Sequence, residues 1–368
     1  MTWHHIQNIH EIDSPALVIY PHRIQKNIER MQEIVGNTQR LRPHVKTHKM
    51  AEVVQLQQEN GIHKFKCATI AEAEMLGQTR AVDVLLSYQP VGPKANRLLQ
   101  LVEHFPKTKY ACLVDDHDAA QHLSDVFQEK NKIVEVWLDL DVGQHRTGVF
   151  ADQRALDLFI FCKKVKGIEP VGLHVYDGHI RDTDFSQRKK RSDKCFQLVE
   201  KLISQIESMG FQKPKIVAGG SPSFTVHAQR DEIDCSPGTC LLWDYGYNHL
   251  LPEQKFNYAA LVISRIISKP SDNFICVDLG HKSIAAENPF PRVHFLNLPD
   301  AKAVSQSEEH LVLDVGNNSK YKVGMVLYGV PIHICPTCAL YEKAFVVDKN
   351  GWVNKEWRIV ARDRRITK

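Results

Sequence analysis

Residues 64–72 read KFKCATIAE, and this stretch decides the fold because a strand candidate passes directly into a helix start. The run KFKCA (64–68) is short, carries apolar side chains and has strand character. Thr69 and Glu72 have the spacing of a capping box, in which the two side chains satisfy backbone N–H groups at the first turn of a helix. The stretch therefore predicts a strand followed at once by a helix.

The same alternation of apolar runs and helical patterns extends from the start of the chain to about residue 245. The strand candidates are ALVIY (16–20), LRPHV (41–45), KFKCA (64–68), DVLLSY (83–88), KYACLV (109–114), IVEVWLDL (133–140), PVGLHVY (170–176) and KIVAGG (215–220). Helical spacing of apolar residues is clear in RIQKNIERMQEIVG (23–36) and CFQLVEKLISQIESMG (195–210). About eight strand–helix alternations in a chain of this length predict a parallel sheet closed into a (β/α)₈ barrel.

The pattern changes after residue 250. Strand-like runs follow one another with Gly, Pro, Asn and Asp between them, and long helical periodicity is absent: FNYAALVISRIIS (256–268), FICVDLG (274–280), HLVLDVG (310–316) and GMVLYGV (324–330). We therefore expect two domains, a barrel over residues 1–250 and a mostly β domain over residues 251–368, with residues 1–12 packing on the latter.

Composition narrows the class of protein. The chain has 368 residues, 43% hydrophobic and 24% charged, with a net charge of +4, which is too small for a dedicated nucleic-acid binder. No run of 18 apolar residues predicts a membrane span, and the first residues lack the pattern of a secretory signal. Nine scattered cysteines, an odd number, are typical of reduced thiols in a cytoplasmic protein.

In a barrel, catalytic side chains follow the C-terminal ends of the strands, and this rule selects candidates from the whole first domain. A lysine, an arginine, a tyrosine, a histidine and small glycine-rich turns would meet on one face. They are Lys46, Arg146, Tyr176, His179, Ser221, Gly238 and Thr239.

Lys46 lies within RPHVKTHK (42–49), where Arg42, His44, His48 and Lys49 crowd it. Neighbouring cations favour the neutral amine that Schiff-base chemistry needs. The turns GGSPS (219–223) and SPGT (236–239) expose backbone N–H groups, which can cradle a phosphate. A lysine with a phosphate cradle indicates pyridoxal phosphate (PLP). The alternative is a solvated strand end next to ordinary turns.

A second candidate site is HICPTC (333–338). His333 and Cys335 lie two residues apart, so in a strand their side chains would point to the same face. Imidazole and thiolate together suit a metal such as zinc with open coordination positions. Alternatively, His333 is a strand-end histidine and Cys335 a buried apolar residue, or Cys335 and Cys338 form a redox pair or half of a structural zinc site.

These motifs resemble, in order and over nearly the whole chain, the D-threonine aldolase / D-serine dehydratase family, which is related to alanine racemase and has the PLP fold type III barrel. The matching segments are SPALVIYPHRIQKNIERM (14–31), RPHVKTHK, LDLDVGQHRTGV (138–149), GLHVYDGH (172–179), GGSPS, SPGTCLLWDYG (236–246), SEEHL (307–311) and HICPTCALY (333–341). RPHVKTHK and the His-x-Cys pair are the most specific of them.

The resemblance implies a role for each candidate residue. Lys46 would bond the cofactor and move the Cα proton, Arg146 would contact the phenolic oxygen, and Tyr176 would lie near the pyridine ring. Ser221, Gly238 and Thr239 would hold the phosphate. His333 and Cys335 would bind a divalent metal, zinc or manganese, beside the PLP. His179 would take the substrate hydroxyl proton.

One position departs from the alanine racemase pattern. Alanine racemases have an arginine against the pyridine nitrogen two residues before the phosphate-binding glycine, and this chain has Ser236 there. A neutral partner makes the ring a poorer electron sink, which speaks against a racemase. His-x-Cys resembles the dehydratase branch, whereas aldolases often have His-x-Asp.

The resemblance therefore implies a PLP- and metal-dependent lyase that acts on D-β-hydroxy amino acids, with D-threonine aldolase first, D-serine dehydratase second and an amino-acid racemase third. It also implies a head-to-tail homodimer whose active sites are completed by the partner's β domain. A PLP-carrier protein without turnover and a basic RNA-binding protein are the alternatives outside the enzyme class. The β domain speaks against the first and the small net charge against the second.

Overall fold

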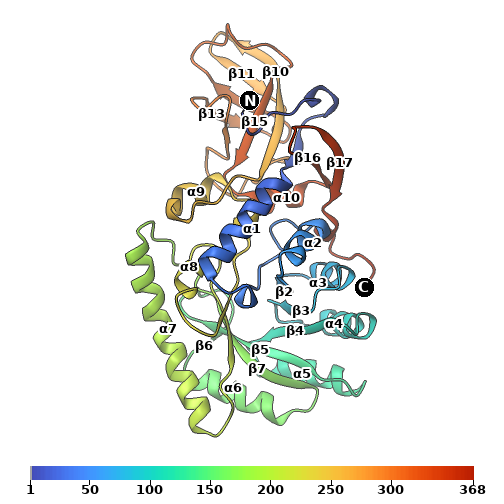
Figure 1. Ribbon diagram of the computed structural model, residues 1–368, viewed down its shortest axis with the longest axis vertical. Coiled ribbons are helices and arrows are strands. Elements are labelled where there is room, and N and C mark those ends of the chain that lie inside the picture. The colour runs from blue at the N-terminus through green and yellow to red at the C-terminus, as the bar shows by residue number, and fades with distance from the viewer. Residues whose placement is uncertain (1) are drawn as a thin grey trace. The chain divides into compact units, whose positions relative to one another are not determined.

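The computed structural model describes residues 2–368 as two compact units, each built on its own sheet (Figure 1). The barrel unit comprises Met31–Lys46, Val54–Gly238 and Asp363–Lys368. The β unit comprises the residues up to Arg30, Thr47–Val53 and Thr239–Arg362. Among the described residues, no helix combines the length and apolar character needed to cross a membrane.

The barrel unit contains a parallel sheet of eight strands in the order β2-β3-β4-β5-β7-β8-β9, with β6 beside β5. The strands are β2 (Lys64–Cys67), β3 (Asp83–Leu86), β4 (Lys109–Val114), β5 (Val134–Asp141), β6 (Val149–Phe150), β7 (Ile168–Val175), β8 (Lys215–Ala218) and β9 (Ile233–Cys235). Their rising order along the chain is that of a singly wound barrel.

Residues 41–45, which we term the closing segment, join the two edges of this sheet. Arg42 N donates to Cys235 O of β9 at 2.9 Å, and Val45 N donates to Lys66 O of β2 at 2.9 Å. Leu41 and His44 form parallel bridges to the same two strands. The closing segment therefore completes the ring, which confirms the predicted barrel.

One strand prediction is wrong, and one strand was missed. ALVIY (16–20) was expected in the barrel, but β1 (Ala16–Ile19) pairs antiparallel with β10 (Ala260–Ser271) and parallel with β16 (Lys343–Val347) of the β unit. The barrel takes β9 instead, which is three residues long and too short to be recognised by periodicity. All four residues of β1 are buried, as expected of a central strand with neighbours on both sides.

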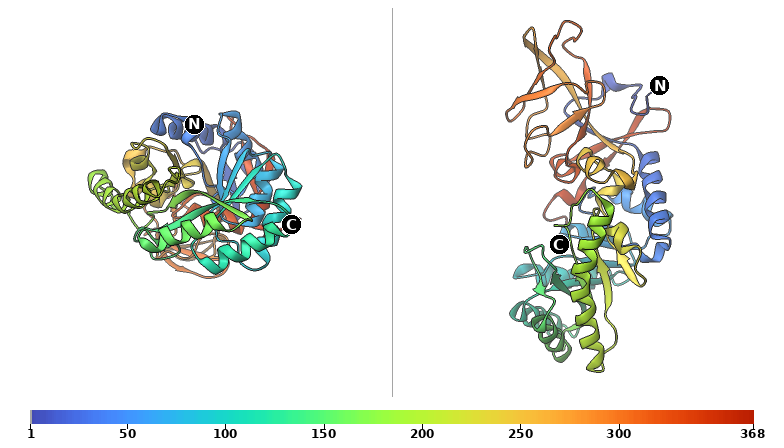
Figure 2. Two further views of the ribbon diagram at one scale, coloured as in Figure 1. Left: turned by 90° about the horizontal axis from the view of Figure 1, so that it is seen from below. Right: turned by 90° about the vertical axis from the view of Figure 1, so that its left-hand side faces the viewer.

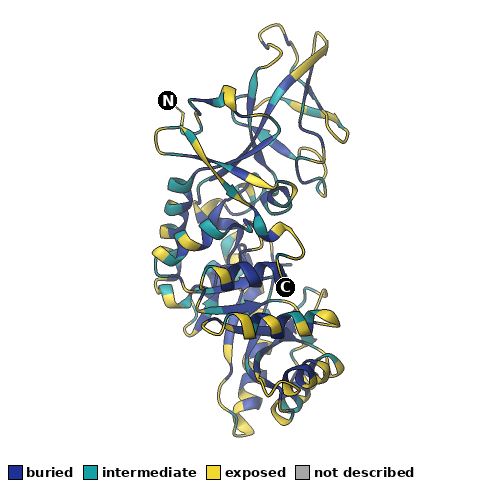
Figure 3. Ribbon diagram, turned by 90° about the vertical axis from the view of Figure 1, so that its right-hand side faces the viewer, coloured by how far each residue is buried: buried dark blue, intermediate teal, exposed yellow. Residues whose placement is uncertain are grey.

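Helices lie outside the curled sheet of the barrel unit (Figure 2), and buried and exposed residues alternate along them (Figure 3). They are α2 (Ala51–Glu59), α3 (Ile70–Gln78), α4 (Pro93–His104), α5 (His117–Gln128), α6 (Gln153–Lys164), α7 (Phe185–Ser208) and α8 (Phe224–His227), preceded by α1 (Pro21–Val35). The predicted cap of α3 is present, because Thr69 accepts from Glu72 N at 3.1 Å and Glu72 accepts from Ala68 N at 2.6 Å. In α7, the apolar residues predicted at helical spacing are buried: Phe196, Val199, Leu202, Ile203 and Ile206.

The β unit contains a nine-stranded sheet in the order β13-β14-β11-β10-β1-β16-β17, in which β15 pairs with both β10 and β12. Its remaining elements are β11 (Phe274–Val277), β12 (Val293–Phe295), β13 (Lys302–Gln306), β14 (Leu311–Asp314), β15 (Val326–Pro331), β17 (Val353–Arg358), α9 (Tyr245–Leu250) and α10 (Ile334–Leu340). Its core brings Ile6, Ile12 and Val18 from the start of the chain against Leu261 and Val330. The predicted mostly β domain is confirmed.

Candidate active site

A cavity of about 560 Å³ opens where the barrel strands end, and it is lined by both Lys46 and Arg146. Its other lining residues also lie at or just after strand ends: His44, Ala68, Ser87, Tyr88, Gln89, Val91, Leu113, Asp115, Asp139 and Thr147. Lys46 follows the closing segment, and Arg146 follows β5. The structure thus brings together two candidates that lie a hundred residues apart in the sequence.

Tyr176 follows β7 and lies beside Arg146. The guanidinium carbon of Arg146 is 4.9 Å from the centre of the tyrosine ring, within cation–π range. A Cβ added to Gly220 would come within 2.9 Å of the same ring. Tyr176 therefore lies against the glycine turn that the sequence predicts as part of a phosphate cradle.

The two predicted phosphate turns meet. Gly238 N donates to Ser221 Oγ at 3.4 Å, which joins the turn after β8 to the turn after β9. Gly219 has φ +76°, a conformation that favours glycine. Glycines next to an aromatic ring leave room for a small anionic group at backbone N–H groups, so these residues fit the phosphate of PLP. Thr239, the last residue predicted for the cradle, belongs to the β unit, where its Oγ1 lies 3.3 Å from Cys335 Sγ.

A buried hydrogen-bond network around Asp177 holds the glycine turn after β8. Asp177, next to Tyr176, accepts hydrogen bonds from Ser192 Oγ at 2.9 Å and from Ser223 Oγ, and it pairs with His227 Nε2 at 2.9 Å. Although burial opposes ionisation, His227 and the two hydroxyls lower the pKa of Asp177 to about 2. The ionised carboxylate therefore ties the turn after β8 to α7 and α8.

The structure places His179 against Gly143, where an added Cβ would be 3.0 Å from His179 Nε2. Its Nδ1 atom is buried and has no hydrogen-bond partner in the structure. Burial lowers the pKa of His179, so the imidazole is neutral at physiological pH and able to accept a proton. Its role as the base that takes the hydroxyl proton stays a prediction.

Most of RPHVKTHK is buried, so it is not a basic surface patch: among its basic residues only Lys46 is exposed, and Lys49 is half-buried. Arg42 is buried and pairs with Asp83 at 2.5 Å and with Asp234 at 3.2 Å. His44 Nδ1 accepts from Lys46 N at 3.2 Å, and His44 Nε2 lies 3.2 Å from Ser87 Oγ. Two carboxylates thus balance the charge of Arg42. Arg42 therefore does not act as an unbalanced positive charge near Lys46, as the sequence analysis assumed.

Two residues of the barrel interior were missed by the sequence analysis, Lys66 on β2 and His174 on β7, and they form a chain of contacts with Asp139 on β5. Lys66 Nζ is 3.3 Å from His174 Nε2, and His174 Nδ1 is 2.7 Å from Asp139 Oδ1. Burial and the positive charge of Lys46 lower the pKa of Lys66 to about 7. The two-residue period of a strand places Lys64 and Lys66 on one face of β2, but it does not show that Lys66 is buried.

In the β unit, His333 and Cys335 lie at the start of a helix and not in a strand as expected. His333 is the N-cap of α10, and Cys335 belongs to its first turn, so the same-face argument for a strand does not apply. Cys335 Sγ lies 3.1 Å from Thr47 Oγ1, and His333 Nδ1 is hydrogen-bonded to Glu287. Although burial acts in the opposite direction, Cys335 and Glu287 raise the pKa of His333 to about 9.

This pair fits a metal site with open positions. Imidazole and thiol are suitable donors, and a carboxylate on one histidine nitrogen is the usual way in which a metal-binding imidazole is oriented. Within residues 2–368, no group of three or more His, Cys, Asp and Glu side chains is arranged around a metal position. The protein would therefore supply two ligands. Cys338, the other half of the predicted CxxC, is a buried free thiol.

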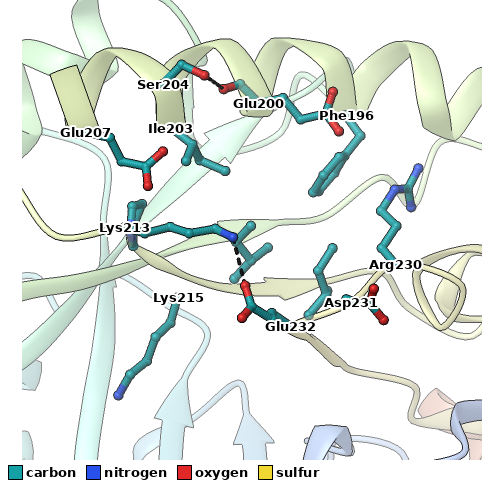
Figure 4. Close-up of a pocket in the computed structure, with 13 residues that line it drawn as sticks. Phe196, Glu200, Ile203, Ser204, Glu207, Lys213, Lys215, Arg230, Asp231 and Glu232 are labelled. Atoms are coloured by element: carbon teal, nitrogen blue, oxygen red, sulfur yellow. Dashed lines mark hydrogen bonds and ion pairs between the residues drawn. The ribbon is translucent and has the colours of Figure 1, made fainter.

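A larger cavity, about 740 Å³, is not part of this site (Figure 4). It lies between α7 and the starts of β8 and β9, and Lys213 crosses it to pair with Glu232 at 2.8 Å. None of the predicted site residues lines it. In (β/α)₈ barrels the active site lies at the C-terminal ends of the strands, whereas residues at the N-terminal ends serve stability. This cavity lies at the N-terminal ends, so its size does not make it the active site.

Comparison with known proteins finds a matching family model in each of the two units. The model for the alanine racemase N-terminal domain matches residues 19–246, and the model for a putative serine dehydratase domain matches residues 259–347. The chain is 27% identical to a D-threonine aldolase from Arthrobacter sp. over 95% of this chain and 93% of that protein. It is 25% identical to D-threo-3-hydroxyaspartate dehydratase from Delftia sp. over 90% of this chain and 93% of that protein.

A solved structure of a related protein has the same fold. The crystal structure of D-threonine aldolase from Filomicrobium marinum matches with a TM-score of 0.88 at 25% identity, covering 95% of this chain and 96% of that one. Because the family model spans more than half of the chain, from residue 19 to residue 246, the chain belongs to the alanine racemase N-terminal domain family of PLP enzymes, in the group that contains D-threonine aldolase and D-serine dehydratase.

Proposed function

We propose that this protein is a PLP- and divalent-metal-dependent lyase for D-β-hydroxy amino acids, and that its reaction is the D-threonine aldolase reaction, from D-threonine to glycine and acetaldehyde. The observation that carries the proposal is the cavity at the strand ends, which Lys46 and Arg146 line together. The similarity to a D-threonine aldolase over nearly the full length of both chains supports it.

When bound, PLP stabilises the electron pair left on Cα when one of its bonds breaks. The residues of this chain would hold and orient it: Lys46 as the attached amine, Arg146 and Tyr176 around the ring, and Ser221, Gly238 and Thr239 at the phosphate. Ser236 Oγ donates its proton in a hydrogen bond to the backbone oxygen of Arg42 at 2.9 Å. A hydroxyl in this state adds no positive charge at the pyridine nitrogen, which disfavours a racemase.

The metal would be held by His333 and Cys335. A divalent cation polarises a substrate hydroxyl and lowers its pKa. The imidazole of His179 would then take the hydroxyl proton, and the neutral state that burial gives this side chain suits that role. Loss of that proton leads to cleavage between Cα and Cβ. Zinc and manganese are both compatible with an imidazole donor, and the thiol of Cys335 favours zinc.

D-Serine dehydratase, which converts D-serine to pyruvate and ammonia, is the second candidate. Two observations favour it: the thiol of Cys335 in the His-x-Cys pair, and the match of residues 259–347 to a putative serine dehydratase domain. In this reaction Lys46 would take the Cα proton and the hydroxyl group would leave. The two reactions differ in their products, so one assay distinguishes them.

The test supplies D-threonine and D-serine separately to the purified protein after incubation with PLP, with and without a chelator. We expect a visible absorbance band that Lys46→Ala removes and that Lys49→Ala, a change three residues away, retains. Acetaldehyde and glycine from D-threonine, lost on chelation, would support the aldolase. Pyruvate and ammonia from D-serine alone would assign the dehydratase, and absence of the band in the unmodified protein would contradict the cofactor assignment.

A further inference from the structure

Residues 363–368 are part of the barrel unit, although the residues directly before them belong to the β unit. The segment lies beside α3 and α4, where two side chains hold it (Figure 1). Glu74 of α3, which is fully buried, accepts hydrogen bonds from Thr367 N at 3.0 Å and from the Thr367 hydroxyl. Arg97 of α4 donates to the backbone oxygen of Arg364 at 3.0 Å. These contacts fix the place of Arg364 on the barrel unit.

Arg364 lines a pocket of about 220 Å³, which we term the side pocket, next to the candidate active site. Ala68 and Tyr88 line both the side pocket and the cavity that contains Lys46 and Arg146. The two spaces therefore share a wall just after the ends of β2 and β3. The other residues that line the side pocket are Thr69, Ile70, Leu86, Lys94 and Arg97.

The side pocket is positively charged. Three cations line it, and no acidic residue does so within the described part of the chain. Lys94 Nζ lies 4.3 Å from the centre of the Tyr88 ring, a contact that leaves its charge in place. Across residues 2–368, neither Lys94 nor Arg364 forms an ion pair with a carboxylate. Cations without a carboxylate partner in a pocket attract an anionic group.

The position of the side pocket indicates which anionic group enters it. Lys46 lies in the main cavity, so the reacting end of a bound amino acid and its α-carboxylate stay there. The side pocket lies beside that cavity, so a group that enters it belongs to the far end of a substrate side chain. Lysine and arginine bind carboxylates through charge-assisted hydrogen bonds, which are stronger than those between neutral groups.

We propose that the side pocket binds a carboxylate at the end of the substrate side chain, so that D-β-hydroxy amino acids with an acidic side chain are substrates besides D-threonine. Lys94 and Arg364 are then specificity-determining residues, and Glu74 and Arg97 position the segment that carries Arg364. This inference rests on the proposed function, because it takes the main cavity to bind a D-β-hydroxy amino acid.

The experiment compares D-configured 3-hydroxyglutamate with 3-hydroxyglutamine, which has nearly the same shape and lacks the side-chain charge. Cleavage of 3-hydroxyglutamate between Cα and Cβ gives glycine and 3-oxopropanoate, and its dehydration gives 2-oxoglutarate and ammonia, so both candidate reactions are detected. The proteins are the unmodified enzyme loaded with PLP and zinc, Arg364→Gln, Lys94→Gln and Arg365→Gln. Arg365 is the matched control, because it is an exposed arginine next to Arg364 that does not line the side pocket.

We expect the unmodified enzyme to have a higher kcat/KM for 3-hydroxyglutamate than for 3-hydroxyglutamine. Arg364→Gln and Lys94→Gln should each lower kcat/KM for 3-hydroxyglutamate on the order of tenfold, mainly through KM, as expected for the loss of one charge-assisted hydrogen bond. They should leave 3-hydroxyglutamine unaffected, and Arg365→Gln should change neither value. An equal loss for both substrates, or the same loss in Arg365→Gln, would overturn the role of the side pocket.

A binding measurement decides the matter if neither substrate is turned over, in which case the proposed function fails. Glutarate, a dicarboxylate of the same chain length without the reacting groups, is titrated calorimetrically into the same four proteins. Weaker binding by Arg364→Gln and Lys94→Gln than by Arg365→Gln would support the side pocket as a carboxylate site on its own. Equal glutarate binding by all four proteins, or no binding by any of them, would overturn it.

Discussion

At the scale of single residues, the enclosed amine of Lys66 makes the stability of the protein depend on pH. Its pKa is lowered from 10.5 to about 7, so between these values the unfolded chain holds a proton that the folded chain has lost. Stability then rises with pH, and the cost of burying this amine is fully present below pH 7 and absent above pH 10.5.

Lys66→Met should therefore stabilise the protein at pH 7 and should lose this advantage as the pH approaches 10. The measurement is the urea midpoint of both proteins at a series of pH values, because a shift in midpoint at constant slope reports stability. Lys64→Met provides the comparison, since Lys64 is paired with Asp234. An advantage of Lys66→Met that is independent of pH would show that its amine does not titrate in this range.

The pairing of His333 with Glu287 is the second prediction for a single residue. The carboxylate occupies Nδ1 and so orients the ring, and removal of such an orienting partner lowers metal affinity about 10- to 100-fold in metalloproteins. Glu287→Gln should weaken zinc binding by this factor without changing the fold. A competitive titration against a chromogenic chelator measures it. Glu342→Gln, which alters an exposed ion pair with Arg358, is the control, and equal zinc affinities in the two variants would contradict the role of Glu287.

Sequence patterns locate residues at strand ends more readily than residues inside the barrel, for a physical reason. Lys46 and Arg146 follow strands, where the barrel rule applies to any polar side chain. Lys66 lies within a strand, where a lysine normally indicates an exposed position, and only a partner from another strand makes its burial tolerable. That partner, His174, lies over a hundred residues away, and its contact with Lys66 depends on the barrel being closed.

At the scale of elements, the closing segment joins β9 to β2, and Arg42 is its main side-chain anchor. Arg42 is buried and pairs with Asp83 of β3 and with Asp234 of β9. Arg42→Ala would leave the partly buried Asp83 without this buried cation and Asp234 with Lys64 alone. Breaking a buried ion pair costs about 3 to 5 kcal/mol, and we expect a cost at the lower end of this range because the two carboxylates are only partly buried. Lys109→Ala, which breaks the more exposed pair with Glu135, should cost no more than about 1 kcal/mol.

Urea unfolding at pH 7 and at lower pH tests this prediction. Although burial opposes it, Arg42 lowers the pKa of Asp83, so the stability that this pair provides is present above the unfolded value of 3.8 and is lost as the pH falls through the lower folded value. The difference between the unmodified protein and Arg42→Ala should therefore shrink in acid. Equal costs for Arg42→Ala and Lys109→Ala at pH 7 would show that Arg42 does not anchor the closing segment.

Element type was predictable from periodicity, but the partners of short strands were not. The spacing in α7 and the cap of α3 are local signals, and both are found in the structure. β1 has an apolar run and a following helix like the barrel strands, yet it pairs with β10 and β16, which follow it by more than two hundred residues. Pairing at this separation depends on the shape of the finished sheet, which local patterns do not encode.

At the scale of the whole molecule, the position of β1 means that the β unit cannot be complete without the start of the chain. β1 lies between β10 and β16 in the sheet order, so a fragment that begins at Thr239 lacks the strand that connects its two halves. Such a fragment would expose the edges of both strands, which favours aggregation over folding.

We predict that residues 239–362 alone do not fold, and that residues 2–30 fused to them through a flexible Gly/Ser linker restore a cooperative unit. Dispersed amide NMR signals and a single unfolding transition would establish folding. Val18→Asp in the fused chain is the matched control, because Val18 is fully buried in the core of the β unit and a lone carboxylate there has no partner that the core provides. If the fragment without residues 2–30 folds as well as the fused chain, β1 is an accessory strand; if only the fused chain folds and Val18→Asp abolishes this, the start of the chain is what makes the β unit one sheet.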